Sequence, residues 1–258
     1  MSLPIRQLFW TYCIPAIIGM MINGIYAIVD GIFIGHAMGG VGLAASNLAW
    51  PISSFILAFG VMIGTGAATN YSILVGAEKS DEAQIYAANS LVLSLVTSLI
   101  VGTLVYILSR QLLVIQNATG EILGFANDYI QITAIASLPF ILGTVLPILV
   151  RNDQKPRLAT IMLVAGAITN IILDWLFIIE LDLKLAGAAY STVAAQLLIT
   201  IWGLGYFIRK WINQSLGLRK FNLNLKVSLG TFVIGFSSFF SVVYIAFVVT
   251  VHNHRVWL

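Results

Sequence analysis

The sequence predicts an all-α integral membrane protein, a bundle of six transmembrane helices followed by a seventh. Two observations predict this class. Hydrophobic residues make up 59% of the 258 positions and charged residues only 9%, whereas a soluble domain carries about 25% charged residues. Apolar runs of roughly 20 residues or more, long enough to cross ~30 Å of hydrocarbon, also recur along the chain. The bilayer is therefore expected to be the main solvent of this protein.

Seven apolar segments are the candidate spans. They lie at about residues 12–37, 43–76, 88–114, 123–150, 157–180, 185–208 and 227–250, and glycine, charged and polar residues collect between them. The first has no short apolar region with a small-residue cleavage site, so we expect a retained helix and not a signal peptide. The second is longer than one perpendicular crossing, which predicts tilt or an extension beyond the membrane. Pro139 and Pro147 favour a kink in the fourth.

The segments group into three parts. We expect a six-helix transmembrane bundle over residues 1–208, a basic cytoplasmic linker over 209–226 and the first helix of a truncated second bundle over 227–258. The linker holds five basic residues and no acidic one. The chain then stops after its seventh helix, so we expect a truncated product.

The basic residues predict the orientation in the membrane. When the loops are assigned alternately to the two sides, one side carries ten lysines and arginines and the other three. Basic residues are enriched in cytoplasmic loops, so we expect a cytoplasmic N-terminus in a bacterial plasma membrane. This placement also explains the net charge of +3 without nucleic-acid binding, because the basic residues lie in loops without interleaved aromatic residues.

Ionisable residues deep within the spans are the informative exceptions to the apolar pattern. Two are clear, Asp30 in the first span and Asp174 in the fifth. Asn23, Tyr26 and Asp30 follow one helical stripe at offsets of three and four residues, and Asn170 and Asp174 are an i, i+4 pair. Intramembrane charges are costly and usually functional.

These residues are expected to meet at one depth. At ~1.5 Å per helical residue, both aspartates lie ~12 to 14 Å below the outer surface, and Thr192 and Gln196 of the sixth span lie ~10 to 17 Å below it. Carboxylate, amide and hydroxyl oxygens suit a hard monovalent cation such as sodium, and suit a proton equally well. The alternative is that each aspartate hydrogen-bonds a neighbouring Asn or Ser and serves only helix packing.

An enzymatic function has little support. The sequence shows no glycine-rich phosphate loop, no His/Cys metal cluster and no Ser-His-Asp arrangement. We therefore expect neither catalysis nor a cofactor, apart from a coupling ion. The single cysteine, Cys13, has no disulfide partner in the chain.

The first six spans resemble the multidrug and toxic compound extrusion transporters, the MATE family, and most closely its bacterial multidrug-export members. The similarity lies in four stretches: Pro15 followed by the residues Asn-Gly-Ile-Tyr-Ala-Ile-Val-Asp-Gly at 23–31, Val-Arg-Asn-Asp-Gln-Lys-Pro at 150–156, Asn-Ile-Ile-Leu-Asp at 170–174 with Phe-Ile at 177–178, and Gly-Ala-Ala-Tyr-Ser-Thr-Val at 187–193. Together these stretches are specific, whereas any one alone is weak.

The resemblance implies a twelve-helix transporter of two six-helix bundles that alternates between outward-open and inward-open states. It further implies export of cationic amphipathic drugs in exchange for sodium or protons. By position, the family's cation site falls on Asp30, Asn170, Asp174 and Thr192, with Asn23, Tyr26 and Gln196 lining the site or the substrate path, and Pro15 falls on the proline at which the first helix is thought to bend. Nearly all of the second bundle is missing from this sequence, so a C-terminal half is an expected partner. Two other functions stay open: a flippase for lipid-linked saccharides and a non-transporting membrane fragment.

Overall fold

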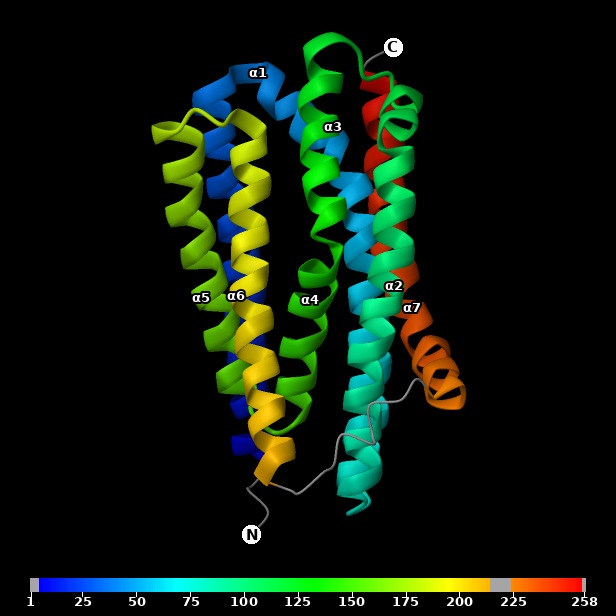
Figure 1. The fold of residues 1–258 in the computed structure, drawn as a ribbon. Helices are drawn as coiled ribbons and strands as arrows, with labels where there is room; N and C mark the ends of the chain where they lie inside the picture. Colours follow the sequence, from blue (N-terminus) through cyan, green and yellow to red (C-terminus); the bar gives the residue numbers. More distant parts are fainter. Residues whose placement is uncertain (1–4, 214–223, 257–258) are drawn as a thin grey trace.

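The computed structural model describes residues 5–213 and 224–256, and all regular secondary structure in these ranges is helical (Figure 1). The helices stand side by side as one bundle, with α1 running through it and α7 on its flank. The predicted all-α class is confirmed. The expectations for residues 1–4, 214–223 and 257–258 lie outside the described residues.

Helix α1, Ile5–Gly76, contains the first two predicted spans. Its helical geometry is interrupted at Gly39, where φ is 60° and ψ is −147°, and Figure 1 shows its two halves running in opposite directions along the bundle. Glycine adopts this left-handed backbone without the steric cost of a Cβ atom. The turn is tight: a Cβ on Gly42 would lie 2.5 Å from the Met38 Cβ. The break predicted between the first two spans is therefore a corner within one helix.

The third and fourth spans are α2, Ser80–Ile115, and the bent pair α3, Gly120–Ile135, with α4, Ser137–Asn152. The axes of α3 and α4 differ by 62°. Pro139 explains the bend, because a proline in a continuous helix would clash with the carbonyl four residues earlier, whereas it is tolerated in a first turn. The predicted kink of the fourth span is thus a break at Ala136.

The last three spans are α5, Pro156–Asp174, which continues as the π-helix η1, Trp175–Glu180, then α6, Lys184–Asn213, and α7, Leu225–Val256. Pro156 begins α5 at a position that needs no hydrogen-bond donor. Helix covers both ends of the predicted linker, because α6 runs on to Asn213 and α7 begins at Leu225.

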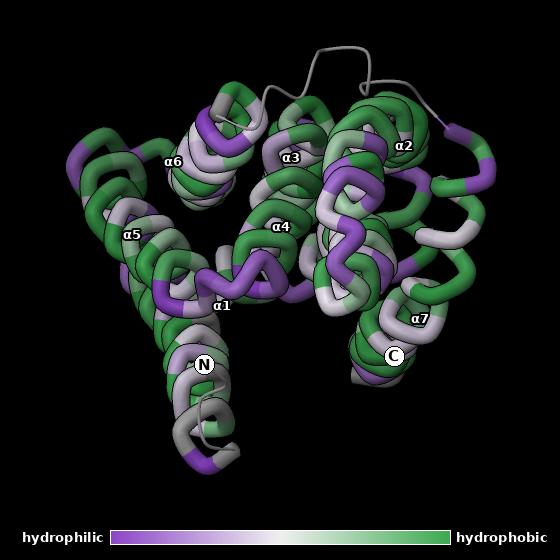
Figure 2. Tube along the Cα trace, turned by 90° about the horizontal axis from the view of Figure 1, so that it is seen from below, coloured by the Kyte–Doolittle hydropathy of each residue, from purple (hydrophilic) through white to green (hydrophobic). Residues whose placement is uncertain are grey.

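The outer surface of the bundle is apolar. Large hydrophobic side chains such as Ile28, Leu99 and Ile201 are more than 60% exposed, and Figure 2 shows hydrophilic residues gathered at the helix ends and connections. Five described helices are long and apolar enough to cross a membrane, and the bent pair makes a sixth. Because α1 reverses at Gly39, it supplies the first two predicted spans. The chain is a multi-pass membrane protein.

Helix α7 lies against the second half of α1 at a very short separation. A Cβ on Gly66 of α1 would lie 1.9 Å from the Thr231 carbonyl oxygen, and one on Gly235 of α7 would lie 2.0 Å from that of Met62. Glycines permit such close backbone approach between membrane helices. The seventh helix is therefore packed as part of this structure.

A buried polar network ties the bundle together at the end where α4 meets α5. Asp153, in the connection between them, accepts hydrogen bonds from Tyr71 and Tyr206 at 2.5 Å and from the Lys210 amine at 2.6 Å. Asp153 is buried, so its charge is compensated by one cation and two hydroxyl donors from α1 and α6.

Candidate cation-binding site

The predicted polar residues converge where the first half of α1 faces α5 and α6. Tyr26 and Asp30 come from α1, Asn170 and Asp174 from α5, and Thr192 from α6. The Asp30 and Asp174 carboxylates lie close enough to interact electrostatically. Two like charges from separate helices therefore share one region of the bundle.

Asp174 is fully buried at the end of α5, directly before the π-helix. The Ser191 hydroxyl of α6 donates a hydrogen bond to its Oδ1. The Asn170 amide nitrogen lies 3.3 Å from the Ser191 hydroxyl and 3.4 Å from that of Thr192. Helix α6 can reach this part of α5 because a Cβ on Gly187 would already be 3.0 Å from the Phe177 backbone of the π-helix. These contacts hold the α5 and α6 oxygens in place.

Three oxygens at the site lack partners. Asp30 Oδ1, Asp174 Oδ2 and Asn170 Oδ1 are buried without a hydrogen-bond partner among the described residues. Buried polar atoms are almost always satisfied, so unsatisfied ones need an explanation. All three are acceptors only, and two belong to carboxylates that repel each other. Such a set fits a small cation or a proton. The packing alternative accounts for Asp174 Oδ1, which accepts a hydrogen bond from Ser191, and leaves all three of these acceptors unexplained.

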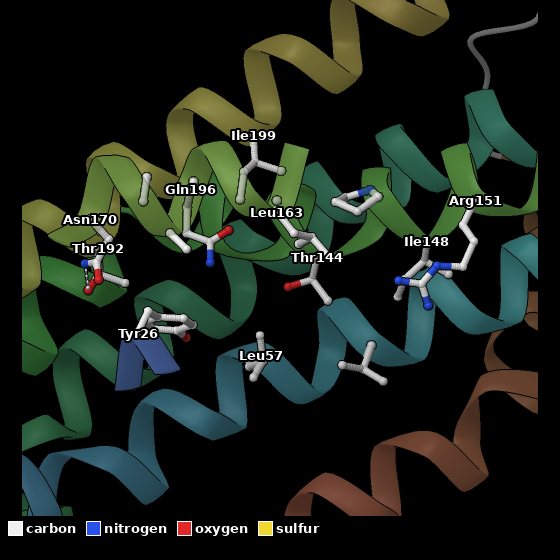
Figure 3. A pocket seen from close by; sticks show the side chains of 16 residues that line it. Tyr26, Leu57, Thr144, Ile148, Arg151, Leu163, Asn170, Thr192, Gln196 and Ile199 are labelled. Carbon is white, nitrogen blue, oxygen red and sulfur yellow. Dashed lines mark hydrogen bonds between the residues drawn. The ribbon is translucent and has the colours of Figure 1, made fainter. Parts of the chain in front are cut away.

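The site opens onto a cavity of about 270 Å³ between α1, α4, α5 and α6 (Figure 3). Tyr26, Asn170, Thr192 and Gln196 all line it. Four of the residues predicted from the sequence to form or line the site thus share one space.

Two other functional residues, Asn23 and Pro15, are predicted from the sequence. The side chain of Asn23 lies outside the described residues. Pro15, expected as the bend of the first helix, is buried near the start of α1, and its carbonyl oxygen accepts a hydrogen bond from Thr160 of α5 at 3.0 Å; its role as a hinge stays a prediction. Helical geometry continues through Pro15, because Gly39 is the interruption within α1.

Three residues that shape the site were not predicted. Ser191 holds Asp174, Tyr129 of α3 interacts with Thr192 and with the aspartates, and Arg151 lines the cavity. Serine and tyrosine are ordinary residues in membrane helices, so neither stands out from a sequence pattern. In the sequence, Arg151 belongs to the ten basic residues on one side and to the stretch at 150–156, and neither pattern indicates that its side chain lines a cavity.

The ligand set differs from that of a transition-metal site. Within residues 5–213 and 224–256, no three His, Cys, Asp or Glu side chains converge. The candidate site offers two carboxylates with an amide and hydroxyls, and hard cations prefer such oxygen ligands.

A helical membrane bundle with ionisable residues beside an internal cavity is typical of membrane transport proteins. The family model MatE matches residues 15–176, and the chain belongs to this family of multidrug and toxic compound extrusion transporters.

Curated relatives described as multidrug export protein MepA match this chain. The one from Staphylococcus haemolyticus is 30% identical over 90% of this chain and 51% of its own length. The one from Staphylococcus saprophyticus is 27% identical over 88% of this chain and 51% of its own length. The chain therefore spans about half the length of the curated relatives that it matches. These relatives do not favour the flippase alternative.

The fold also matches solved structures. A multidrug resistance MATE family transporter of the MOP superfamily, in its outward-facing conformation, superimposes with a TM-score of 0.83 at 24% identity, over 90% of this chain and 51% of that chain. This likeness independently supports the helical arrangement.

Proposed function

We propose that this chain is the N-terminal bundle of a secondary antiporter that exports cationic amphipathic drugs from a bacterial cell in exchange for sodium or protons. Its N-terminus lies in the cytoplasm, and the remaining half of the transporter comes from a C-terminal bundle. The curated relatives are described as multidrug exporters, which supports the substrate class.

The convergence of unsatisfied carboxylate oxygens from α1 and α5 carries this proposal. The coupling ion binds among Asp30, Asn170, Asp174 and Thr192 and relieves the repulsion between the two carboxylates. Because Asp30 lies on α1 and Asp174 on α5, neutralisation changes how closely the two helices associate. A ligand shifts a conformational equilibrium only by its difference in affinity between the two states, so the site must change geometry during transport.

Ethidium transport in proteoliposomes tests this function. The chain is reconstituted alone and together with the C-terminal half of a MATE relative, and a sodium or proton gradient is imposed. We expect gradient-driven ethidium movement that is lost in Asp174→Asn, which keeps the size of the side chain and removes its charge.

Asp128→Asn is the matched control, because Asp128 of α3 is exposed. It should transport like the unaltered chain. Equal ethidium transport by Asp174→Asn and the unaltered chain would refute the proposed coupling site.

A further inference from the structure

The cavity beside the candidate cation site is elongated along the bundle. Figure 3 shows Asn170, Thr192 and Tyr26 at one end and Arg151 at the other, with Gln196 and Thr144 between them. Arg151 lies in the last turn of α4. The cavity therefore runs from Tyr26, Asn170 and Thr192, the neighbours of the aspartate pair, to the end of the bundle where α4 meets α5, which is the cytoplasmic end in the proposed orientation.

Two further unsatisfied polar side-chain atoms face this space. Gln196 Oε1 and Arg151 Nε are buried without a hydrogen-bond partner among the described residues, as is Asn170 Oδ1. Both residues line the same cavity as Asn170. Unsatisfied atoms thus mark its beginning, middle and end.

Helix α4 adds a backbone acceptor beside Gln196. Pro147 has no N–H, so the carbonyl of Gly143, four residues earlier, lacks its usual helical donor. Gly143 also makes room for the glutamine, because a Cβ there would lie 2.1 Å from Gln196 Oε1. Gly143, Pro147 and Gln196 all line the cavity, so they form a polar step halfway along it.

The volume is sufficient for solvent. A water molecule occupies roughly 30 Å³ of liquid, and a site holds water when it is polar and roomy. About 270 Å³ with several unsatisfied acceptors meets both conditions. Leu57, Leu163 and Ile199 on the walls offer no competing hydrogen bonds, so a hydrated ion would interact mainly with the polar step and the two ends.

Arg151 lies at the mouth of this cavity. It is partly exposed, forms no ion pair among the described residues, and one of its guanidinium nitrogens would be 3.8 Å from a Cβ on Gly19 of α1. An uncompensated positive charge at the mouth of a cavity repels cations, and it does so more strongly in low dielectric than in water.

We propose that the cavity is the inner half of the coupling-ion pathway. A small monovalent cation or a proton moves through it between the aspartate pair and the cytoplasm, with Gln196 as an intermediate ligand and Arg151 as the electrostatic gate. This inference rests on the proposed cation site and adds the route by which the ion leaves it.

Two neighbouring residues of α1 allow a matched test. Leu57 lines the cavity, whereas Ile56 is fully buried in the apolar core. Leu57→Cys and Ile56→Cys are made in a Cys13→Ser background and reconstituted in oriented vesicles. The thiols are exposed from the cytoplasmic side to 2-aminoethyl methanethiosulfonate, which is small and positively charged.

We expect Leu57→Cys to react at least ~10-fold faster than Ile56→Cys, a difference of about 1.4 kcal/mol in activation free energy. At constant pH, sodium should slow the reaction of Leu57→Cys, and Asp174→Asn should abolish that slowing. For protons, the rate of Leu57→Cys is divided by that of Ile56→Cys at the same pH, because acid lowers the thiolate fraction of every cysteine; this ratio should fall at low pH, and Asp174→Asn should abolish the fall. Arg151→Gln should accelerate the cationic reagent severalfold while leaving the neutral reagent methyl methanethiosulfonate nearly unchanged.

Equal, slow labelling of both cysteines would overturn the pathway, as would fast labelling of Leu57→Cys that sodium does not slow and whose ratio to the Ile56→Cys rate does not change with pH. The unfolding temperature of the unaltered chain, measured against sodium and pH, separates the two proposals. If the coupling ion raises it and Asp174→Asn removes the effect, the site stands even when the pathway fails. If neither ion changes it, the cation site itself is refuted.

Discussion

At the scale of single residues, the buried carboxylates of this bundle differ in whether their oxygens have partners. Asp153 is paired with Lys210 and two tyrosine hydroxyls. Asp30 and Asp174 each keep an oxygen without a partner among the described residues. A carboxylate whose oxygens are all hydrogen-bonded or paired with a cation has no oxygen left to bind a ligand, so its role is structural. The uncompensated pair is the part of the molecule that can respond to an ion.

The Asp153 network yields a stability prediction. Asp153→Asn removes the only carboxylate facing the Lys210 amine among the described residues and should lower the free energy of unfolding by about 2 to 4 kcal/mol, because breaking a buried pair leaves a charge unpaired. Thermal or denaturant unfolding in detergent measures the loss.

Lys79→Gln is the control for this change. It breaks the ion pair between Lys79 and Glu82, whose side chains are 57% and 56% exposed, respectively. An exposed pair contributes about 0 to 1 kcal/mol. If both substitutions lowered the free energy of unfolding by a similar amount, the Asp153 network would not be a stabilising contact between the helices.

At the scale of helices, proline and glycine decide where the elements bend and how closely they approach. Gly39 turns α1 back on itself, and Pro139 separates α3 from α4. Pro15 and Pro51 leave α1 helical. A proline at the start of a new helical segment breaks the chain direction, whereas one in the interior removes a single hydrogen bond and can be tolerated in a membrane helix.

The contact between α1 and α7 gives the element-scale prediction. Gly66→Ala would place a methyl group against the Thr231 backbone, which cannot move aside like a flexible side chain. We expect the α1–α7 contact to loosen at a cost of about 1 to 3 kcal/mol, measured as a lower unfolding temperature and faster proteolysis near α7.

Gly230→Ala is the matched substitution on α7. Its added Cβ would meet only the Tyr86 hydroxyl at 3.9 Å, so stability should stay the same or rise by up to ~1 kcal/mol from better helix propensity. If Gly66→Ala is tolerated as well as Gly230→Ala, the close crossing does not hold α7 in place.

At the scale of the whole molecule, the spans and their charge asymmetry predict the orientation in the membrane. In the proposed orientation, with the N-terminus in the cytoplasm, the α1–α2 connection is cytoplasmic and the turn before α6 is external. In the Cys13→Ser background, Lys79→Cys should react with an impermeant thiol reagent from the cytoplasmic side, and Lys184→Cys from the outside. The reverse pattern would place the proposed cation path on the wrong side.

The residue pattern alone predicted the membrane class, the positions of the spans and the polar residues at membrane depth. Each of these follows from local composition, because the length of an apolar run can be compared with the thickness of the bilayer and a charged residue within such a run is conspicuous. It could not show that Asp174 is held by Ser191 or that Tyr129 joins the site. It also treated Arg151 as a loop charge.

Those features were decided by the tertiary structure alone, because each depends on how helices rotate and cross. A helical period places side chains on a stripe but leaves open which neighbour that stripe faces. Close approaches at Gly143, Gly187 and Gly66 set these rotations, and so bring Gln196 to α4, α6 to the π-helix and α7 to α1. The residue types predicted the chemistry of the site, whereas its geometry depends on backbone contacts between segments that are distant in the sequence.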